Sequence, residues 1–381
     1  MGLRPEGRRR RTRGGWDVFI RGVPVPRRGG VFRDFLEFAN LPEDSIGLVR
    51  AWLIECLRPE TPYVGLALYG TQGSAKSTSQ AMLRDLIDPS TQNLRVLPPD
   101  LSGLHASAQA SHVLSFENVS LLKPDMQDHL CATLTGAAVG QRALFTNTDE
   151  ALIALKRPVI MNGITAFVTR PDLLDRSIVL ELPAIDSARR RTHEAVWAGF
   201  EDAKPRLLGA LLTSFSKALA LLPEVRRQPH ELPRMSDFAL LGEAITQGLA
   251  KDAAKVRGQF IKRFERNRRA AIGGVIEHSP VAMAISRYVK ENGPLEGTVG
   301  DVLQQLRQAA ERQDAHAALP NTERGFGEDL KRLTPVLAQH GIAVEKGART
   351  MHGYPLKIST IGRAGRRPRS KTRQFKTGLG R

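Results

Sequence analysis

A nine-residue segment at 70–78, GTQGSAKST, has the residue types needed to bind nucleotide phosphates. It follows the phosphate-loop pattern G-x-x-x-x-G-K-[ST] at Gly70, Lys76 and Ser77, and Ala75 stands where the pattern has its second glycine. In such loops the backbone N–H groups surround the β-phosphate, the lysine reaches the β- and γ-phosphates, and the serine hydroxyl binds Mg²⁺. We therefore predict that this segment binds ATP and Mg²⁺ through Gly70, Thr71, Gln72, Gly73, Ser74, Ala75, Lys76, Ser77 and Thr78. The alternative is a Gly- and Ser-rich surface loop before a helix.

Polar residues end two later apolar runs. VLSFEN places Glu117 and Asn118 after a short run, where an acid would lie at the ligand-binding edge of a parallel sheet. Glu117 is predicted to hold the Mg²⁺ shell or orient the attacking water, and Asn118 to hold the water without accepting its proton. RPVIMNG ends in Asn162, whose amide is predicted to bind the γ-phosphate or the water. The alternatives are an exposed acid after a strand and an Asn-Gly turn.

Two arginines, Arg170 and Arg176, precede the apolar run Ile178–Leu182. In ring ATPases an arginine from a neighbouring subunit stabilises transition-state charge. We favour Arg176 for that role because it directly precedes the run and is therefore held at the start of a rigid element. Pairing with Asp172 or Asp175 as a structural ion pair is the alternative.

Short apolar runs alternating with helical patterns must position these residues. The runs Tyr63–Tyr69, Val113–Phe116, Pro158–Met161 and Ile178–Leu182 are typical of buried strands, and a helix is expected at Ser77–Ile87. This alternation predicts an α/β fold with a parallel sheet and crossover helices. A first helical pattern starts near Phe32 (FRDFLEFANL), and a second runs over about Glu43–Leu57. Further helical patterns cover Ala188 to about Leu222 and Met235–Arg269.

The C-terminal third has a different order, with three helices followed by two short strands. That is the order of a winged helix, in which the third helix carries Lys331 and Arg332 and the loop Lys346–Gly353 is the wing. A protein-interaction domain of the same shape is the alternative.

The predicted domains are 1–31, basic and mostly disordered with a strand at Trp16–Arg21; 32–60, an N-terminal helical segment; 61–185, the ATPase core; 186–272, a helical region; 273–361, the winged-helix-like domain; and 362–381, a basic tail.

Charge and composition exclude several classes of protein. The formal charge of +17 is concentrated at the two ends, because residues 1–31 carry +7 and residues 362–381 carry +8, leaving +2 between them. The tail is therefore expected to contact nucleic-acid phosphates. The two cysteines, Cys56 and Cys131, indicate neither a disulfide framework nor a zinc site, so we expect a cytoplasmic protein. The sequence has no stretch of about 18 uncharged apolar residues, so we do not expect a membrane span.

Taken together, these motifs resemble the superfamily 3 helicases, AAA+-related P-loop ATPases of viruses, phages and plasmids. The resemblance covers about Leu66–Pro183, where Gly70 to Asn162 spans 93 residues, and extends loosely to the C-terminal domain. More narrowly, the chain looks like ATPases of phages or integrated elements that carry a GxQGSAKST loop and a winged-helix C-terminus. It departs from the helicase pattern at Ala75, at Asn118 where many relatives have a second acid, and in lacking a clear Lys-Gly-Gly.

The resemblance implies a channel hairpin that moves along single-stranded DNA. Here VGQRALFTNTDEALIAL, between Val139 and Leu155, would supply two strand halves around a turn at 146–149. Arg142, Phe145, Lys156 and Arg157 are the candidate DNA contacts, with Phe145 stacking on a base. Asp149 and Glu150 count against contact at the tip, and an ordinary surface hairpin is the alternative. The resemblance also implies a homo-oligomeric ring, a hexamer.

Three functions fit these expectations. The first is a DNA helicase of a phage or integrated element, driven by ATP hydrolysis and acting with single-stranded DNA. The second is an ATP-dependent DNA-binding loader or regulator that does not unwind DNA, and the third is a protein-remodelling AAA+ ATPase. A primase is a candidate partner for the first. Residues 1–31 are interpreted as the remnant of a linker, which leads us to expect that an N-terminal primase or other catalytic domain is missing from this sequence.

Overall fold

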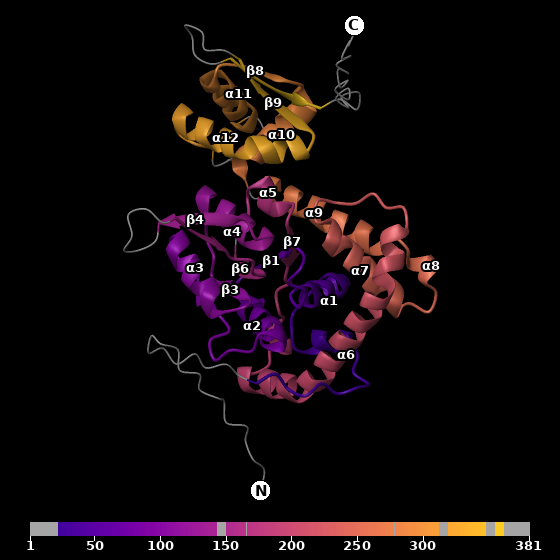
Figure 1. Ribbon diagram of the computed structural model, residues 1–381. Coiled ribbons are helices and arrows are strands. Elements are labelled where there is room, and N and C mark those ends of the chain that lie inside the picture. Colours follow the sequence, from indigo (N-terminus) through magenta and orange to yellow (C-terminus); the bar gives the residue numbers. More distant parts are fainter. Residues whose placement is uncertain are drawn as a thin grey trace, which may run out of the picture. The chain divides into compact units, whose positions relative to one another are not determined.

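The computed structural model describes residues 22–142, 150–164, 166–277, 279–311, 319–347 and 355–361 (Figure 1). The chain forms two compact units, which divide between His278 and Ser279. The predictions for the strand at Trp16–Arg21, for Phe145, for most of the wing and for the basic tail lie outside the described residues.

A five-stranded parallel sheet in the order β2-β3-β6-β1-β7 forms the centre of the first unit. Its strands are β1 (Gly65–Tyr69), β2 (Arg95–Val96), β3 (Leu114–Glu117), β6 (Val159–Gly163) and β7 (Ser177–Glu181). The connecting helices are α2 (Lys76–Ile87), α3 (Leu101–Ala110), α4 (Pro124–Thr135) and α5 (Pro171–Leu174). The predicted α/β fold with a parallel sheet is confirmed, and strand β6 inserts between β1 and β3.

Helices from both ends of this unit pack together beside the sheet (Figure 1). The N-terminal part contributes the 3₁₀ helices η1 (Phe32–Glu37) and η2 (Glu43–Ser45) and the helix α1 (Ile46–Glu55). The C-terminal part contributes η3 (Ser187–Arg189), α6 (His193–Arg227), α7 (Ser236–Leu249), α8 (Ala253–Val256) and α9 (Gln259–Glu277). The region beginning at Phe32 is therefore a 3₁₀ turn rather than the first α-helix that the sequence predicts.

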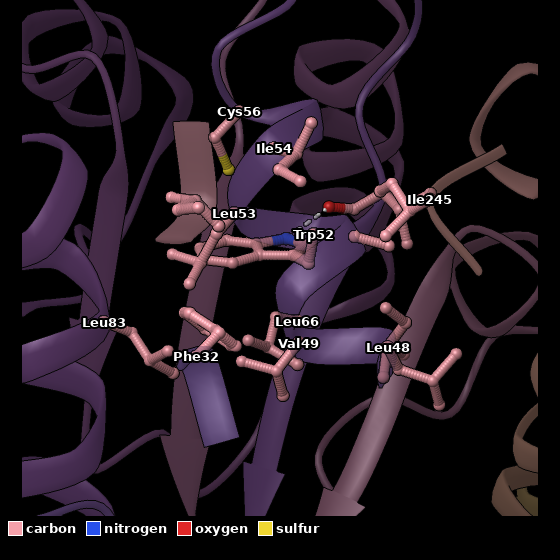
Figure 2. Close-up of a cluster of buried hydrophobic side chains, with 14 of the residues drawn as sticks. Phe32, Leu48, Val49, Trp52, Leu53, Ile54, Cys56, Leu66, Leu83 and Ile245 are labelled. Atoms are coloured by element: carbon pink, nitrogen blue, oxygen red, sulfur yellow. Dashed lines mark hydrogen bonds between the residues drawn. The ribbon is translucent and has the colours of Figure 1, made fainter. Parts of the chain in front are cut away.

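The buried apolar core joins α1 to the sheet and to the helical region. Trp52 on α1 lies at its centre, fully buried, among Leu53, Leu66 and Ile245 (Figure 2). Its indole Nε1 donates to the carbonyl of Val64 at 2.8 Å, so the one polar atom of the ring is satisfied. The N-terminal segment is thus part of the same folded body as the sheet.

Strand β7 forms one edge of the sheet, and an asparagine on α9 covers it. Asn267 accepts a hydrogen bond from the backbone N–H of Val179 at 3.0 Å and donates to its carbonyl at 2.6 Å. An uncovered edge presents free N–H and C=O groups to any other strand. The asparagine satisfies both groups of Val179 and so blocks further pairing at this point.

A separate antiparallel hairpin is formed by β4 (Ala138–Arg142) and β5 (Glu150–Ala154), with Arg142 opposite Glu150. This confirms the two strand halves that the sequence predicts around the turn.

The second unit combines three helices with a three-stranded antiparallel sheet in the order β8-β10-β9. Its elements are α10 (Pro280–Asn292), β8 (Leu295–Gly297), α11 (Val299–Glu311), α12 (Glu323–Gln339), β9 (Ile342–Lys346) and β10 (Leu356–Thr360). The three helices and the last two strands were predicted, whereas β8, only three residues long, was not. The assignment of this unit as a winged helix stays a prediction.

Several helix boundaries differ from those that the sequence predicts. Helix α6 continues through Pro223 to Arg227, and α12 continues through Pro335. The predicted continuous helix Met235–Arg269 is instead three helices, interrupted before α8 and again at Gly258, whose φ is +75°.

By length and composition α6 alone among the described helices could cross a membrane. It buries one face in the core of this unit, as the core helix of a folded domain does.

Candidate nucleotide site

The phosphate-loop residues, the acid and the strand-end amide lie at one edge of the sheet. Strand β6 pairs with β1, with Leu68 opposite Asn162, and with β3, with Phe116 opposite Met161. Because all three strands run in the same direction, their carboxyl ends meet at the same edge. The loop after β1, Glu117 at the end of β3 and Asn162 near the end of β6 are therefore neighbours.

The loop backbone makes tight turns at three residues with positive φ. Gly70 has φ +153° and Gly73 has φ +84°, and Ala75 is also left-handed, with φ +53° and ψ +31°. Left-handed backbone favours glycine, so the alanine occupies the conformation of the glycine that it replaces. Where the sequence pattern has glycine, Ala75 thus takes up a left-handed conformation at a cost in strain.

Lys76 begins α2 and folds back over the loop. Its Nζ donates to the carbonyls of Gly70 at 2.8 Å and Thr71 at 2.7 Å, and to Ser74 Oγ at 3.3 Å. The residue is 8% exposed, and burial lowers the pKa of its ammonium from the ordinary value. A positive charge held in so little water attracts an anion more strongly than one in solvent.

The start of α2 fits an anionic ligand. Ala75, at the N-cap position, provides no side-chain cap, and a helix N-terminus carries unpaired N–H groups and a partial positive charge. The loop residues 70–78 therefore fit the phosphates of ATP. Ser77, half-exposed in the first turn, and the half-buried Glu117 offer the hydroxyl and carboxylate oxygens that Mg²⁺ prefers.

Asn162 is fully buried and links two strands to α2. Its Oδ1 accepts from the backbone N–H of Asn118 at 3.1 Å, and its Nδ2 donates to Gln80 Oε1 at 2.8 Å. Asn118 is exposed and left-handed, with φ +54°, a conformation that asparagine tolerates better than most residues. The predicted phosphate or water contact of Asn162 stays a prediction, and the structure adds contacts within the protein.

Three residues beside the loop were not predicted from the sequence. Gln80 holds Asn162, and Asn40 donates to the carbonyls of Ser74 at 3.0 Å and Pro183 at 2.7 Å. Arg190 is exposed, and a Cβ built on Gly73 would lie 3.4 Å from its Nη2. Its guanidinium therefore reaches the loop that we assign to the phosphates. The run of three arginines at 189–191, after the strand Ile178–Leu182, is the sequence signal that could have found it.

Arg176 directly precedes β7 and therefore lies at the amino ends of the strands, opposite the carboxyl ends that hold the loop. Ser177 pairs with Gly65 at the start of β1, whereas the loop follows the end of β1, four residues or about 13 Å further along. Its guanidinium forms an ion pair with Asp172 and donates to that residue's carbonyl at 2.8 Å. Burial acts to raise the pKa of the Asp172 carboxyl, but the hydrogen bond and charge of Arg176 outweigh it and the pKa is lowered. Arg176 thus has the structural ion pair that the sequence offered as the alternative, and the loop of its own chain is distant.

Arg170 is more exposed than Arg176. Its side chain is 41% exposed and pairs with Asp128 at 3.2 Å. Both arginines therefore form an ion pair with an acid of their own chain, Arg170 with Asp128 and Arg176 with Asp172.

The candidate nucleic-acid contacts lie in several places. The backbone of Arg142 ends β4, and Phe145 lies outside the described residues. The Arg157 side chain donates to the carbonyls of Ala108 at 2.9 Å, Ser111 at 3.2 Å and Lys156 at 3.0 Å, so it braces the start of β6. The Nζ of Lys156 lies 5.9 Å from the Tyr63 ring centroid.

In the second unit, Lys331 and Arg332 are both exposed on α12, and Arg332 donates to Asp329 at 2.9 Å. The roles of all six residues in nucleic-acid binding stay predictions.

The sheet order defines an α/β fold with a five-stranded parallel sheet, and the loop, the acid and the amide meet at the carboxyl ends of its strands. Residues 32–256 match the family model of the actinomycete integrative conjugative element replication protein, AICE RepA, and residues 281–370 match the AICE RepA C-terminal domain. The first match covers more than half of the chain, so the chain belongs to this family of replication proteins.

Comparison with solved structures gives distant similarities. The apo C-terminal region of NrS-1 shares 16% identity over 94% of this chain and 83% of that chain, with a TM-score of 0.40. The SCCmec type IV Cch, described as an active helicase, shares 11% identity over 87% and 67%, with a TM-score of 0.36. The JCV helicase shares 15% identity over 68% and 64%, with a TM-score of 0.31. These scores are too low to carry an argument about activity, and no curated protein matches the chain.

Proposed function

We propose that this replication protein hydrolyses ATP and uses that energy as a DNA helicase. The observation that carries the proposal is the convergence of Lys76, Glu117 and Asn162, from three separate segments, at one edge of the parallel sheet. Such an edge is where open α/β folds bind their ligands. Membership of a replication-protein family supports DNA as the polymer on which the energy is used.

Each residue has a role that follows from its chemistry. The backbone of residues 70–78 and the ammonium of Lys76 bind the phosphates, with Arg190 as an additional cation at the loop. Glu117 orients the attacking water and accepts its proton, for which a carboxylate is suited and an amide is not. Ser77 and Glu117 would hold Mg²⁺, which neutralises phosphate charge when bound. Asn162 is the amide that contacts the γ-phosphate or the water.

The DNA contacts are proposed for residues of the hairpin region and for two exposed basic residues of α12. The hairpin β4–β5 with Arg142, Phe145, Lys156 and Arg157 would follow single-stranded DNA, and Lys331 and Arg332 on α12 would bind a duplex if this unit works as a winged helix. Arg157 is the weakest of these candidates because three backbone carbonyls already occupy its guanidinium. Assembly as a ring and a primase partner belong to the same proposal.

A second candidate function is an ATP-dependent DNA-binding switch with little turnover. The observation that favours it is Asn118, an exposed amide at the place where a second acid would strengthen the metal site. Such a protein would load onto or regulate an origin without unwinding it.

Strand displacement separates the two functions. The experiment measures ATP hydrolysis and unwinding of a labelled forked duplex by the purified full chain, with Glu117→Gln as the inactive control. The helicase proposal expects hydrolysis that rises with single-stranded DNA, and displacement that Glu117→Gln abolishes. Nucleotide-dependent DNA binding without displacement would contradict it and favour the switch.

A further inference from the structure

We propose that Gln80 is a positioning residue that fixes the acid Glu117 relative to the phosphate loop. The inference rests on the proposed ATPase function and concerns a residue for which neither the motifs nor the family assignment suggests a role. Gln80 lies on α2, one helical turn after Lys76, and is fully buried.

The hydrogen bonds of Gln80 run from the loop helix to both neighbouring strands. Its Nε2 donates to Ser115 Oγ at 2.9 Å and to the carbonyl of Phe116 at 3.1 Å, both on β3. Its Oε1 accepts from Asn162 Nδ2 at 2.8 Å, on β6. Both polar atoms of the amide are thereby hydrogen-bonded, and α2, β3 and β6 are joined at a single side chain.

Backbone groups at the two ends of this chain of bonds fix the orientation of both amides. The N–H of Asn118 can only donate, so Asn162 must turn Oδ1 toward it and Nδ2 toward Gln80. The carbonyl of Phe116 can only accept, so Gln80 must turn Nε2 toward it. The two requirements agree, and the network has one consistent arrangement.

The two ends of the chain are the peptide groups on either side of Glu117. The carbonyl of Phe116 belongs to the peptide bond before Glu117, and the N–H of Asn118 belongs to the peptide bond after it. Gln80 and Asn162 therefore hold the backbone of the acid from both sides. Because Gln80 shares a helix with Lys76, a shift of α2 moves the acid with the loop.

The test separates this role from simple stabilisation. Gln80→Met removes every hydrogen bond at similar volume, and Gln247→Met is the matched control. Gln247 is also a buried glutamine, bonded to Gln228 and Glu243 in the helical region away from the loop. We measure kcat for ATP hydrolysis, the affinity for ATP, and the melting temperature of the full chain.

We expect Gln80→Met to lower kcat by at least about tenfold, because a misplacement of about 1 Å at a reacting group can cost up to 10²-fold. Affinity for ATP should change by less than about threefold, because the loop keeps its contacts, and Gln247→Met should change only the melting temperature. Equal kcat in Gln80→Met and wild type would overturn the inference, as would a loss of kcat and affinity together.

Gln80→Glu provides a second readout and decides the matter if Gln80→Met does not fold. Ionised, the new carboxyl still accepts from Asn162 but cannot donate to Phe116; protonated, it regains one donor. Its kcat relative to wild type should therefore rise as the pH falls, and a constant ratio would contradict the inference. Wild-type protein that binds ATP without hydrolysing it would contradict the proposed function instead.

Discussion

Ala75 is the residue at which the phosphate loop departs from its sequence pattern, and its backbone explains the usual glycine. A left-handed alanine costs about 1–2 kcal/mol. Replacement by glycine removes this strain but adds about 0.4–1 kcal/mol of unfolded-state entropy. We expect Ala75→Gly to raise the unfolding free energy by roughly 1 kcal/mol, measured by urea denaturation. Ala81→Gly, in the interior of the same helix, should lower it by about 1 kcal/mol. Destabilisation by both substitutions would contradict the conformation described for Ala75.

The buried cysteines make a prediction about pH. Burial raises the pKa of the Cys131 thiol from its ordinary 9.0 to about 12 and raises that of Cys56 well above 9.0. Unfolded thiols therefore lose their protons at lower pH than folded ones, so stability is present below about pH 9 and is lost as the pH rises toward 12. Denaturation at pH 8 and pH 10 should show a larger loss for wild type than for a Cys56→Ala, Cys131→Ala variant. The same loss of stability between pH 8 and pH 10 in both proteins would contradict this role of the buried thiols.

At the scale of elements, a buried ion pair joins the loop helix α2 to α6. Lys204 on α6 pairs with Asp85 on α2, with side chains 5% and 0% exposed. Removing one partner of a buried pair leaves the other charge without its counter-charge, which typically costs 3–5 kcal/mol. Lys204→Met should therefore lower the unfolding free energy by about 3 kcal/mol, measured by denaturation. Arg206→Met, which breaks only the exposed pair with Asp202 on the same helix, should cost less than about 1 kcal/mol. A loss of unfolding free energy in Lys204→Met as small as that in Arg206→Met would contradict a structural role for the buried pair.

The elements also show what the sequence could predict. Four strands of the sheet were predicted because each is a short apolar run in a largely buried position, and α2 because it follows a phosphate loop. Helix α4 was missed, although Pro124 in its first turn and the left-handed Gly136 after its end mark both boundaries. Helix α3 was also missed, because it is rich in alanine and serine and has no clear apolar stripe.

The site was predictable in its motif residues and not in its supporting contacts. Lys76, Glu117 and Asn162 each end or follow a recognisable pattern. Gln80 contacts Asn162 across 82 positions of sequence, and Asn40 contacts Pro183 across 143, so no local pattern indicates either contact. Both contacts arise only when α2 and the N-terminal segment pack against the ends of the parallel strands.

At the scale of the whole molecule, the place of Arg176 makes a prediction about assembly. Arg176 lies at the amino ends of the strands and Lys76 at their carboxyl ends, so Arg176 could complete a nucleotide site only on another copy of the chain. Arg176→Ala and Lys76→Ala should each hydrolyse little ATP alone, and a mixture of the two should regain partial activity through interfaces with both residues intact. A purely structural pair with Asp172 would instead leave Arg176→Ala active and slightly less stable, and mixing would then rescue nothing.

The central claim is that the edge holding Lys76 and Glu117 hydrolyses ATP for work on DNA. The most direct measurement is phosphate release by the purified full chain, with and without single-stranded DNA, beside Lys76→Ala. We expect wild-type turnover that DNA stimulates, and for Lys76→Ala we expect weak nucleotide binding and a rate reduced by at least about 10²-fold, because the ammonium that reaches the phosphates is lost. Turnover of Lys76→Ala at nearly the wild-type rate would contradict the assignment of the phosphate loop, and a wild-type rate that DNA leaves unchanged would contradict the DNA motor.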